Sequence, residues 1–269
     1  MMTERADMRS RHTFVVPAYG GSPYLRECLA SLRRQTVESI ILVATSTPNE
    51  AIQGAASDFD VPTCVNEGEG GIAGDWNFAL SQATTPYVTI AHQDDVYLPD
   101  YAAAAVAALD AARDPLIFFS DYGELRDGEP VDDNLNLRIK RLLLRRLGTG
   151  ERRASTRNKR HVLSLGCAIS CPTVTYVMGR MPSPVFHGGM RSNLDWDLWE
   201  RLSREEGSFV FEPRILMRHR VHEGSETSAV IADHERTNED LEILKRFWPV
   251  PVARAIARAY SLSERSNGV

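Results

Sequence analysis

Short apolar runs alternate with longer segments of helical periodicity over the first 120 residues of the chain. The runs are rich in β-branched and aromatic residues, as expected of strands that are buried on both faces of a sheet. We therefore predict strands at His12–Val16, Ser39–Val43, Val61–Val65, Tyr87–Ile90 and Leu116–Phe119.

The segments between these runs have the spacing of amphipathic helices. The first carries Leu25, Leu29 and Leu32 on one face, and we expect Ser22 to cap it with Pro23 at its first position. Three further segments predict helices before residue 114: Glu50–Ser57, a segment capped by Asp75, and Pro99 to about Arg113.

Strands that alternate with helices indicate an α/β fold, in which helices cover both faces of a mostly parallel sheet. Ligands of such sheets bind beyond the carboxyl ends of the strands. The segments directly after each strand are therefore the candidates for a binding site: 17–21, 44–49, 66–71, 92–95 and 120–122.

The alternation changes after residue 122. Asp127–Gly128 predicts a hairpin turn. The remaining apolar segments predict strand and turn at Leu163–Val177, strands at Phe209–Phe211 and Arg214–Met217, and helices at Asp195–Arg204, Glu235–Trp248 and Val252–Leu262.

Two adjacent acids, Asp94 and Asp95, stand where the strand Tyr87–Ile90 ends. Adjacent carboxylates repel each other, and packing does not require them at an exposed strand end. A divalent cation that bridges to phosphate oxygens would require them, because hard cations prefer oxygen ligands. We therefore expect a metal-bound nucleoside diphosphate at this position. The alternative is an acidic loop, or a helix N-terminus ahead of Pro99.

Composition narrows the class of partner and the compartment. The chain has 269 residues and a formal net charge of −5, which argues against a general nucleic-acid binder. Its four cysteines lack the spacing of a zinc site, and we interpret them mainly as buried small hydrophobes. The start, Met1–His12, has no signal-peptide core, and no run approaches the roughly 20 apolar residues of a membrane span. We expect a cytoplasmic protein.

A basic segment, Arg138–His161, carries the apolar run Leu142–Leu144 within it. Three interpretations stay open: a mobile loop, a solvated helix face, or a surface that contacts anionic lipid. The third would make 138–160 a peripheral membrane contact and would locate the protein at the inner face of the membrane.

Several of these segments together resemble the family 2 glycosyltransferases. Thr13–Tyr19 resembles the opening strand of that family, and Asn66 with Gly71–Asn77 resembles its glycine-containing loop. His92–Asp95 stands where the family has its DxD-type metal motif. Leu194–Trp199 resembles the Glu-Asp-type helix that supplies the catalytic base, and Arg218–His222 through Ser225–Ser228 resembles the late Arg-x-His segment.

The resemblance implies a GT-A fold, a Rossmann-like sheet in a single domain over residues 12–230. Residues 12–122 would form the nucleotide-binding half and 123–230 the acceptor-side half, with 231–269 as a C-terminal helical extension. It also implies transfer of a sugar, with inversion, from a nucleotide-diphosphate sugar to a glycan, lipid-linked or polysaccharide-precursor acceptor. A UDP-sugar is the favoured donor and Mg²⁺ or Mn²⁺ the cofactor.

By the same resemblance, Asp95 would coordinate the metal, and Asp94 would contact ribose or a metal-bound water. His222 is either a third ligand or a phosphate partner, or else a surface histidine. For Asp75 and Asn77 the alternative is capping and core packing. The residues with expected nucleotide or donor contacts are Pro17, Ala18, Tyr19, Thr45, Ser46, Asn66, Gly71, Asp75, Asn77, Asp94 and Asp121.

One departure concerns the second strand, which in the family usually ends in acids that contact base and ribose. Here Val43 is followed by Ala44, Thr45 and Ser46, none of them charged. Thr45 or Ser46 can still bond a ribose hydroxyl or a base edge, but the identity of the nucleotide is left open.

Asp195 is the expected general base, because it starts an amphipathic helix and can point outward while Leu198 and Leu202 point inward. Its alternative role is a helix cap, and Asp197 is the alternative base.

Two rival functions remain open. Gly68–Ala73 fits the GxGxxA pattern of a dinucleotide-binding oxidoreductase, although Glu67, Glu69 and Asp75 surround it. A non-catalytic relative that only binds a nucleotide sugar would also explain the missing acids at Ala44 and Thr45.

Overall fold

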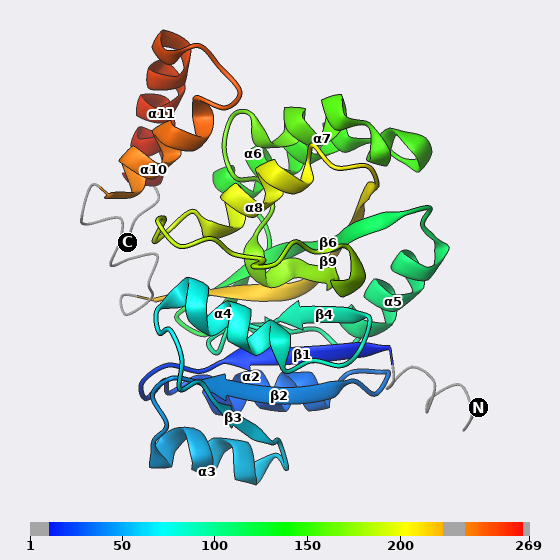
Figure 1. The fold of residues 1–269 in the computed structure, drawn as a ribbon, viewed down its shortest axis with the longest axis vertical. Helices are drawn as coiled ribbons and strands as arrows, with labels where there is room; N and C mark the ends of the chain where they lie inside the picture. The colour runs from blue at the N-terminus through cyan, green and yellow to red at the C-terminus, as the bar shows by residue number, and fades with distance from the viewer. Residues whose placement is uncertain (1–10, 223–234, 266–269) are drawn as a thin grey trace.

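The computed structural model describes residues 11–222 and 235–265 (Figure 1). Its first half alternates strands and helices, as the periodicity predicts. The elements are β1 (His12–Pro17), α2 (Leu25–Arg33), β2 (Ile40–Thr45), α3 (Glu50–Asp58), β3 (Thr63–Val65), α4 (Ile72–Ser81), β4 (Tyr87–Ile90), β5 (Val96–Tyr97) and α5 (Tyr101–Ala111).

The second half contains two long strands and several short helices. Its elements are β6 (Pro115–Arg126), β7 (Glu129–Val131), α6 (Leu135–Leu144), α7 (Thr156–Leu163), β8 (Val174–Val177), α8 (Leu194–Leu202), β9 (Ser208–Val221), α10 (Glu235–Leu244) and α11 (Val250–Arg265). Short 3₁₀ turns at Arg145–Leu147 and Gly150–Ala154 join α6 to α7.

All strands belong to one mixed sheet of order β3-β2-β1-β4-β8-β6-β9-β5, with β7 paired to β6. The strands β3, β2, β1 and β4 are parallel, so their carboxyl ends share one edge. β8 runs antiparallel between β4 and β6. β5 is antiparallel to β9, and pairing of Val96 with Arg218 places the end of β9 beside the segment after β4.

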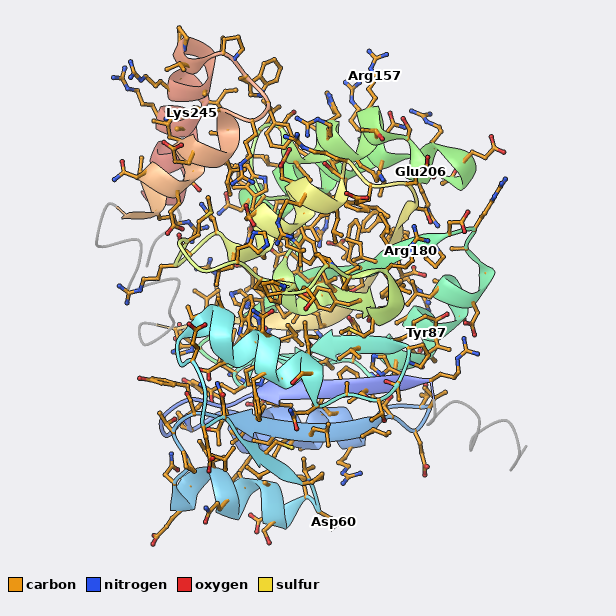
Figure 2. The ribbon with its side chains drawn as sticks, viewed as in Figure 1. Asp60, Tyr87, Arg157, Arg180, Glu206 and Lys245 are labelled. Carbon is orange, nitrogen blue, oxygen red and sulfur yellow. The ribbon has the colours of Figure 1, made fainter. Side chains whose placement is uncertain are left out.

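Two hydrophobic cores cover the two faces of the sheet, and alternate residues of one strand enter different cores. In β1, Val15 packs with α4, α8 and α10, whereas Phe14 and Val16 pack with α2 and α5. The same change of face separates Phe118 from Phe119 in β6. Figure 2 shows these apolar side chains filling the space between the ribbons. A sheet buried on both faces explains the continuous apolar runs.

Two predicted caps are wrong. The helix predicted with Pro23 at its first position begins at Leu25 with Tyr24 at its N-cap, and Ser22 Oγ instead accepts from Tyr24 N at 3.2 Å. The helix after the glycine-rich loop begins at Ile72, before Asp75, with Gly71 at its N-cap at φ 88°. Glycine adopts that φ without the penalty of a Cβ, and this frees the Asp75 side chain for other contacts.

The predicted hairpin at Asp127–Gly128 joins β6 to β7, and both turn residues have positive φ, 49° and 82°. The two strands predicted at Phe209–Phe211 and Arg214–Met217 form the single strand β9. Register shifts against β6 near Asp121 absorb the irregularity that interrupts the sequence pattern.

Some expectations lie outside the described residues, namely those for Ser225–Ser228, for Met1–Ser10 and for a domain boundary between 230 and 231. Over 11–222 and 235–265, no helix combines the length and the apolarity needed to cross a membrane. All four cysteines are free thiols; Cys28 and Cys171 are buried, while Cys64 and Cys167 are half-buried.

Candidate functional site

Asp95 lies fully buried in the loop that follows β4. Its Oδ1 accepts two hydrogen bonds from the end of β9, one from Arg220 N at 2.8 Å and one from His219 Nδ1 at 3.0 Å. Burial acts to lower the pKa of His219, but the charge of Asp95, its hydrogen bond and the charge of Asp94 together outweigh burial and raise the pKa of the imidazole. One oxygen of Asp95 is therefore fixed by the protein.

The second oxygen, Asp95 Oδ2, has no hydrogen-bond partner among the described residues, although it is buried. His92 Nε2 is a second buried polar atom without a partner there. His92 Nδ1 lies 3.9 Å from Asp95 Oδ2, which is beyond hydrogen-bond distance. Two buried polar atoms without partners, on neighbouring side chains, are costly unless a ligand satisfies them.

The neighbouring Asp94 completes a cluster of possible metal ligands. One ligand atom each from His92, Asp94 and Asp95 lies within 4.8 Å of the others. Burial acts to raise the pKa of Asp94, but the charge of His92 and a hydrogen bond from His222 outweigh it and lower that pKa. Two carboxylates with one imidazole fit Mn²⁺ or Mg²⁺ as ligands.

His222 joins this cluster through Asp94 rather than through Asp95. Its Nε2 lies 3.0 Å from Asp94 Oδ2, and its ring packs on Tyr24 with centroids 5.0 Å apart. The fold therefore brings the predicted metal residues Asp94, Asp95 and His222 together, although Asp94 and His222 are 128 residues apart in the sequence.

Arg220 fastens the acid loop to β9 and α2. Its Nε donates to Asp94 O at 2.9 Å, and one terminal nitrogen donates to Glu27 at 2.5 Å. The guanidinium also lies 4.2 Å from the centroid of the Tyr24 ring. These contacts hold the acid pair in place without occupying Asp95 Oδ2.

A second polar group lies at the ends of β2 and β3. Asp75 Oδ1 accepts from Asn66 Nδ2 at 2.8 Å, and Asp75 Oδ2 accepts from Ser46 Oγ at 2.9 Å. Asp75 thus brings a carboxylate from α4 to the end of β2, where the sequence lacks an acid. Asn66 also donates to Glu69 O, and a Cβ on Gly74 would lie 2.2 Å from that oxygen. The glycine-rich loop therefore packs directly on the first turn of α4.

The loop after β1 contacts the acid loop after β4. Tyr19 exchanges two backbone hydrogen bonds with the Gln93 side chain, at 3.1 and 3.2 Å, while its ring is 62% exposed. Pro17 pairs with Ala44 across the sheet, and Ala18 N donates to Ala44 O. Tyr19 is thus left with an open aromatic face at the shared edge.

Two predicted donor contacts have their polar groups engaged inside the protein. Thr45 is 1% exposed and its hydroxyl accepts from Thr47 N at 3.0 Å. Both ends of the Asn77 amide bond the backbone of Phe186, at 2.8 and 2.9 Å. The contacts of Asn77 therefore fit its alternative, structural role rather than a contact with the donor. Its neighbour Trp76 contacts both Phe186 and His92, with centroids 5.0 and 5.3 Å apart.

Asp195 stands at the first turn of α8, half-buried beside the acid cluster. Its Oδ1 accepts from Trp196 N at 2.7 Å, and Cys167 Sγ lies 3.8 Å from Oδ2. Burial raises the pKa of Asp195, and the charges of Arg236, Lys140 and His92 only partly offset this rise. A carboxyl with a raised pKa is better able to accept a proton.

The alternative base, Asp197, is buried and fully engaged. Its Oδ2 accepts from Arg201 at 3.0 Å, and its Oδ1 pairs with Arg246 at 2.6 Å. The pair with Arg201 lies within α8, and the pair with Arg246 attaches α8 to the segment between α10 and α11. The arrangement gives Asp197 a structural contact, whereas Asp195 has no ion pair among the described residues and lies within electrostatic range of His92.

Asp121, at the β-bulge of β6, is held by the helix α6. Its Oδ2 accepts from Arg141 Nε at 2.6 Å, and its Oδ1 accepts from Tyr122 N. Burial raises the pKa of Asp121 and the contact with Arg141 lowers it, with burial the larger effect. Lys140 donates to the Tyr122 hydroxyl at 2.8 Å, so two cations of α6 line the end of β6.

The loop that leads into α8 is fixed by α10. Glu239 accepts hydrogen bonds from the backbone of Arg191, Ser192 and Asn193 at 2.6 to 3.0 Å, and from the Ser192 hydroxyl. Burial acts to raise the pKa of Glu239, but these donors lower it. The C-terminal helices therefore position the segment just before Asp195.

Sequence reasoning missed His92 as a possible ligand, Arg220 as the clamp of the acid loop, and Glu239. The signal for His92 was its place two residues before an acid pair. Arg220 and Glu239 act through contacts more than 40 residues away along the chain, and no local pattern signals those.

The chain is similar in sequence to known glycosyltransferases. An uncharacterized glycosyltransferase of Rickettsia typhi is 22% identical over 233 residues, which cover 81% of this chain and 66% of that protein. The chain thus spans about two thirds of the length of this relative.

Solved structures show the same fold. S. aureus TarS 1-349 in complex with UDP-GlcNAc matches with a TM-score of 0.62 at 18% identity, over 94% of this chain and 71% of that one. The mannosyltransferase PcManGT from Pyrobaculum calidifontis, in complex with GDP-Man and Mn²⁺, matches with a TM-score of 0.58 at 15% identity, over 97% and 76%. The expected GT-A fold is confirmed.

The model of the family described as "Glycosyl transferase family 2" matches residues 13–173, more than half of the chain. This range holds the strand-end loops and the acid pair, and the resemblance seen in the motifs is confirmed. The chain belongs to glycosyl transferase family 2.

Proposed function

We propose that this protein transfers a sugar from a nucleotide-diphosphate sugar to an acceptor hydroxyl, with inversion and with Mn²⁺ or Mg²⁺ as cofactor. The observation that carries the proposal is the pair of buried unpaired atoms, Asp95 Oδ2 and His92 Nε2, beside the ionised Asp94. Family membership supports the same reaction class.

The cation would be held by Asp95 and Asp94, with His92 as a nitrogen ligand and His222 behind Asp94 as a hydrogen-bond partner. A bound cation offsets the charge that develops on the diphosphate leaving group. Arg220 and His219 contribute by fixing Asp95 Oδ1, so that its other oxygen keeps one orientation.

The chemical step in this proposal is a single displacement. Asp195 takes the proton of the acceptor hydroxyl, the acceptor oxygen bonds to the anomeric carbon, and the bond from that carbon to the diphosphate breaks. Burial keeps the pKa of Asp195 above its ordinary value, which suits a base in this step. The positive charge of Lys140 stabilises the ionised carboxylate of Asp195, which is the form that accepts the proton.

The nucleoside would lie across the ends of β1, β2 and β3. Tyr19 offers an aromatic face, Asp75 and Asn66 offer polar atoms, and Ser46 orients Asp75. UDP is the favoured nucleotide, in line with the UDP-GlcNAc complex of TarS. The acceptor, a glycan or lipid-linked precursor, would approach between Asp195 and Asp121.

The oxidoreductase alternative is weakened by the first turn of α4. A dinucleotide-binding helix presents a free N-terminus to pyrophosphate. Here Asp75 brings a carboxylate to that turn, and the backbone of Glu69 packs on Gly74.

A screen of UDP-, GDP- and dTDP-sugars for donor hydrolysis tests the proposal, each with Mn²⁺, with Mg²⁺ and with a chelator. We expect one UDP-sugar to be hydrolysed only with the metal, and Asp195→Asn to abolish transfer while retaining UDP binding. Binding of a UDP-sugar without any turnover in the unchanged chain would favour a non-catalytic binding protein, and unchanged turnover in Asp195→Asn would exclude Asp195 as the base. Binding of NAD(H) without any response to UDP would favour the oxidoreductase.

A further inference from the structure

The helix α6 is apolar on two opposite faces. Leu137 and Leu144 are 1% and 4% exposed and pack into the protein. On the other side, Leu135, Ile139 and Leu142 are 64%, 43% and 62% exposed. Their spacing of four and three residues places these three side chains in one stripe along the helix. A helix that only faced water would carry polar residues on this side.

Arginines border this exposed stripe. Arg138 is exposed and by helical spacing lies beside the face of Leu135 and Leu142, and Arg145 and Arg146 are exposed in the 3₁₀ turn that directly follows α6. Arg138 pairs with Asp133, while Arg145 and Arg146 have no ion pair among the described residues. The outer surface of α6 is therefore aliphatic along its centre and cationic at its border.

The cations of the whole segment divide into two groups. Residues 138–160 hold ten Lys and Arg and one acid, Glu151, in a chain of net charge −5. Five of the ten are engaged inward: Lys140, Arg141, Arg153, Lys159 and Arg160 contact backbone or side chains of β6, β9 and α8, or the turns beside them. The other five are exposed: Arg138, Arg145, Arg146, Arg152 and Arg157.

These exposed cations lie at one end of the molecule. Figure 1 shows α6 and α7 side by side at the end opposite α3, and Figure 2 shows the Arg157 side chain directed outward from it. The exposed cations thus come from α6, α7 and the turns that join them.

This chemistry fits an anionic lipid surface. Aliphatic side chains enter the acyl boundary of a bilayer, and flanking arginines bind the headgroup phosphates. A symmetric dimer would bring the same arginines against each other, because a two-fold interface pairs a patch with itself. Nucleic acid would satisfy the arginines but would leave the aliphatic stripe against phosphate.

The inner side of the same helix borders the candidate acceptor site. Lys140 and Arg141 contact Tyr122 and Asp121, and the charge of Lys140 reaches Asp195. A helix that lies on a membrane with its outer stripe would therefore hold the site of sugar transfer near the headgroups.

We propose that α6 binds an anionic membrane surface, with Leu135, Ile139 and Leu142 in the interface and Arg145 and Arg146 on headgroup phosphates. The consequence for catalysis, a lipid-linked acceptor presented at Asp195, rests on the function proposed above. Membrane binding itself does not depend on that function.

Vesicle co-sedimentation of the full chain tests the proposal, with phosphatidylcholine vesicles that contain or lack phosphatidylglycerol. We expect binding to the anionic vesicles only, weakening as NaCl is raised. Leu135→Ser with Leu142→Ser should weaken binding about tenfold or more, and so should Arg145→Glu with Arg146→Glu. The control is Val250→Ser with Val252→Ser, because these α11 side chains are 43% and 42% exposed outside α6.

UDP binding with Mn²⁺ is measured for every variant, so that a folding defect or a failure of the proposed function is seen separately. Equal binding to neutral and anionic vesicles, or leucine variants that bind like the unchanged chain, would overturn the proposal. So would a dimer, detected by light scattering, that the leucine variants dissociate, because that result would assign the stripe to a second copy of the chain.

Discussion

The two halves of the sheet edge hold their polar groups in different ways. At the ends of β2 and β3, Ser46, Asn66 and Asp75 bond one another over at most 29 residues of chain. At the ends of β4 and β9, Asp94 and Asp95 are held by His219, Arg220 and His222 from more than 120 residues away. The first group is local and holds a single carboxylate among neutral side chains, and the second is dense in charge and long-range.

This difference separates two tasks in the proposed reaction. A local network of hydrogen bonds suits recognition of an uncharged nucleoside, where small shifts in position cost little. A charged cluster must keep its geometry against repulsion, and contacts from a distant strand supply that rigidity. We expect substitutions in the second region to have the larger effects.

The largest effect is expected at Asp195, the proposed base, which lies within electrostatic range of His92. Asp195→Asn keeps the hydrogen bond from Trp196 N but removes the base, and should lower kcat by about 10²–10⁴-fold. UDP affinity should not change, because the nucleoside region is untouched. Steady-state kinetics with calorimetry measure both, and a loss of UDP affinity equal to the loss of rate would contradict the role.

Asp197→Asn is the matched variant two residues away. It should lower stability by roughly 1–3 kcal/mol, because Arg201 and Arg246 lose their partner, and should leave kcat within a few-fold. Denaturant unfolding measures the stability. A kcat loss as large as that of Asp195→Asn would assign the base to Asp197 instead.

The pH profile of transfer should report the same carboxyl. Because burial raises the pKa of Asp195 and the base acts when deprotonated, the rate should fall as pH decreases through a value above the ordinary 3.8. The residual activity of Asp195→Asn should lose this acidic limb. A limb that is unchanged in the variant would belong to another group.

A moderate effect is expected at Glu239, which links the C-terminal helices to the charged region. Glu239→Gln should lower stability by about 1–2 kcal/mol and slow transfer several-fold, because the loop before Asp195 loses its acceptor. The pKa of Glu239 is lowered in the folded protein, so its contribution is present at neutral pH and is lost as pH falls through that pKa.

The control for Glu239 is Glu242→Gln on the same helix, where the Glu242 side chain is exposed and pairs with Lys245. It should change neither stability nor rate. Equal effects of the two substitutions would show that α10 has no specific role in positioning the loop.

The smallest effect is expected in the local group formed by Ser46, Asn66 and Asp75. Ser46→Ala removes one hydrogen bond to Asp75 and should raise the KM for the donor only a few-fold. The control is Ser81→Ala on the exposed side of α4, where the hydroxyl donates to Phe78 O and accepts from Gln82 Nε2; it should not change the KM. A large loss of kcat in Ser46→Ala would contradict the assignment of this group to nucleoside recognition alone.

The sequence predicted the local region better than the long-range one. The apolar runs of β1, β2, β3 and β4 identified the parallel half of the sheet, because burial on both faces leaves a clear pattern. The acid pair was identified because adjacent carboxylates repel each other unless a cation binds between them. The caps at Ser22 and Asp75 were predicted wrongly, since tertiary contacts decided which turn residue begins each helix.

Other features had no signal in the sequence. The carboxylate at the end of β2 comes from Asp75 in α4, so the missing acids at Ala44 and Thr45 were misleading. The amide of Asn77 bonds Phe186, which is 109 residues away. The single long β9 was divided in two because its bulges against β6 interrupt the alternation. Each of these depends on packing between segments that no local window contains.

Calorimetric titration of UDP with and without Mn²⁺ tests the central claim most directly, in the unchanged chain, in Asp95→Asn and in Asp114→Asn. Asparagine in place of Asp95 keeps an oxygen for Arg220 N and removes the charge at Oδ2. The control residue, Asp114, is an exposed acid directly before β6. We predict that Mn²⁺ tightens UDP binding about tenfold or more in the unchanged chain and in Asp114→Asn, and has no effect in Asp95→Asn. Equal enhancement by Mn²⁺ in all three would contradict the account.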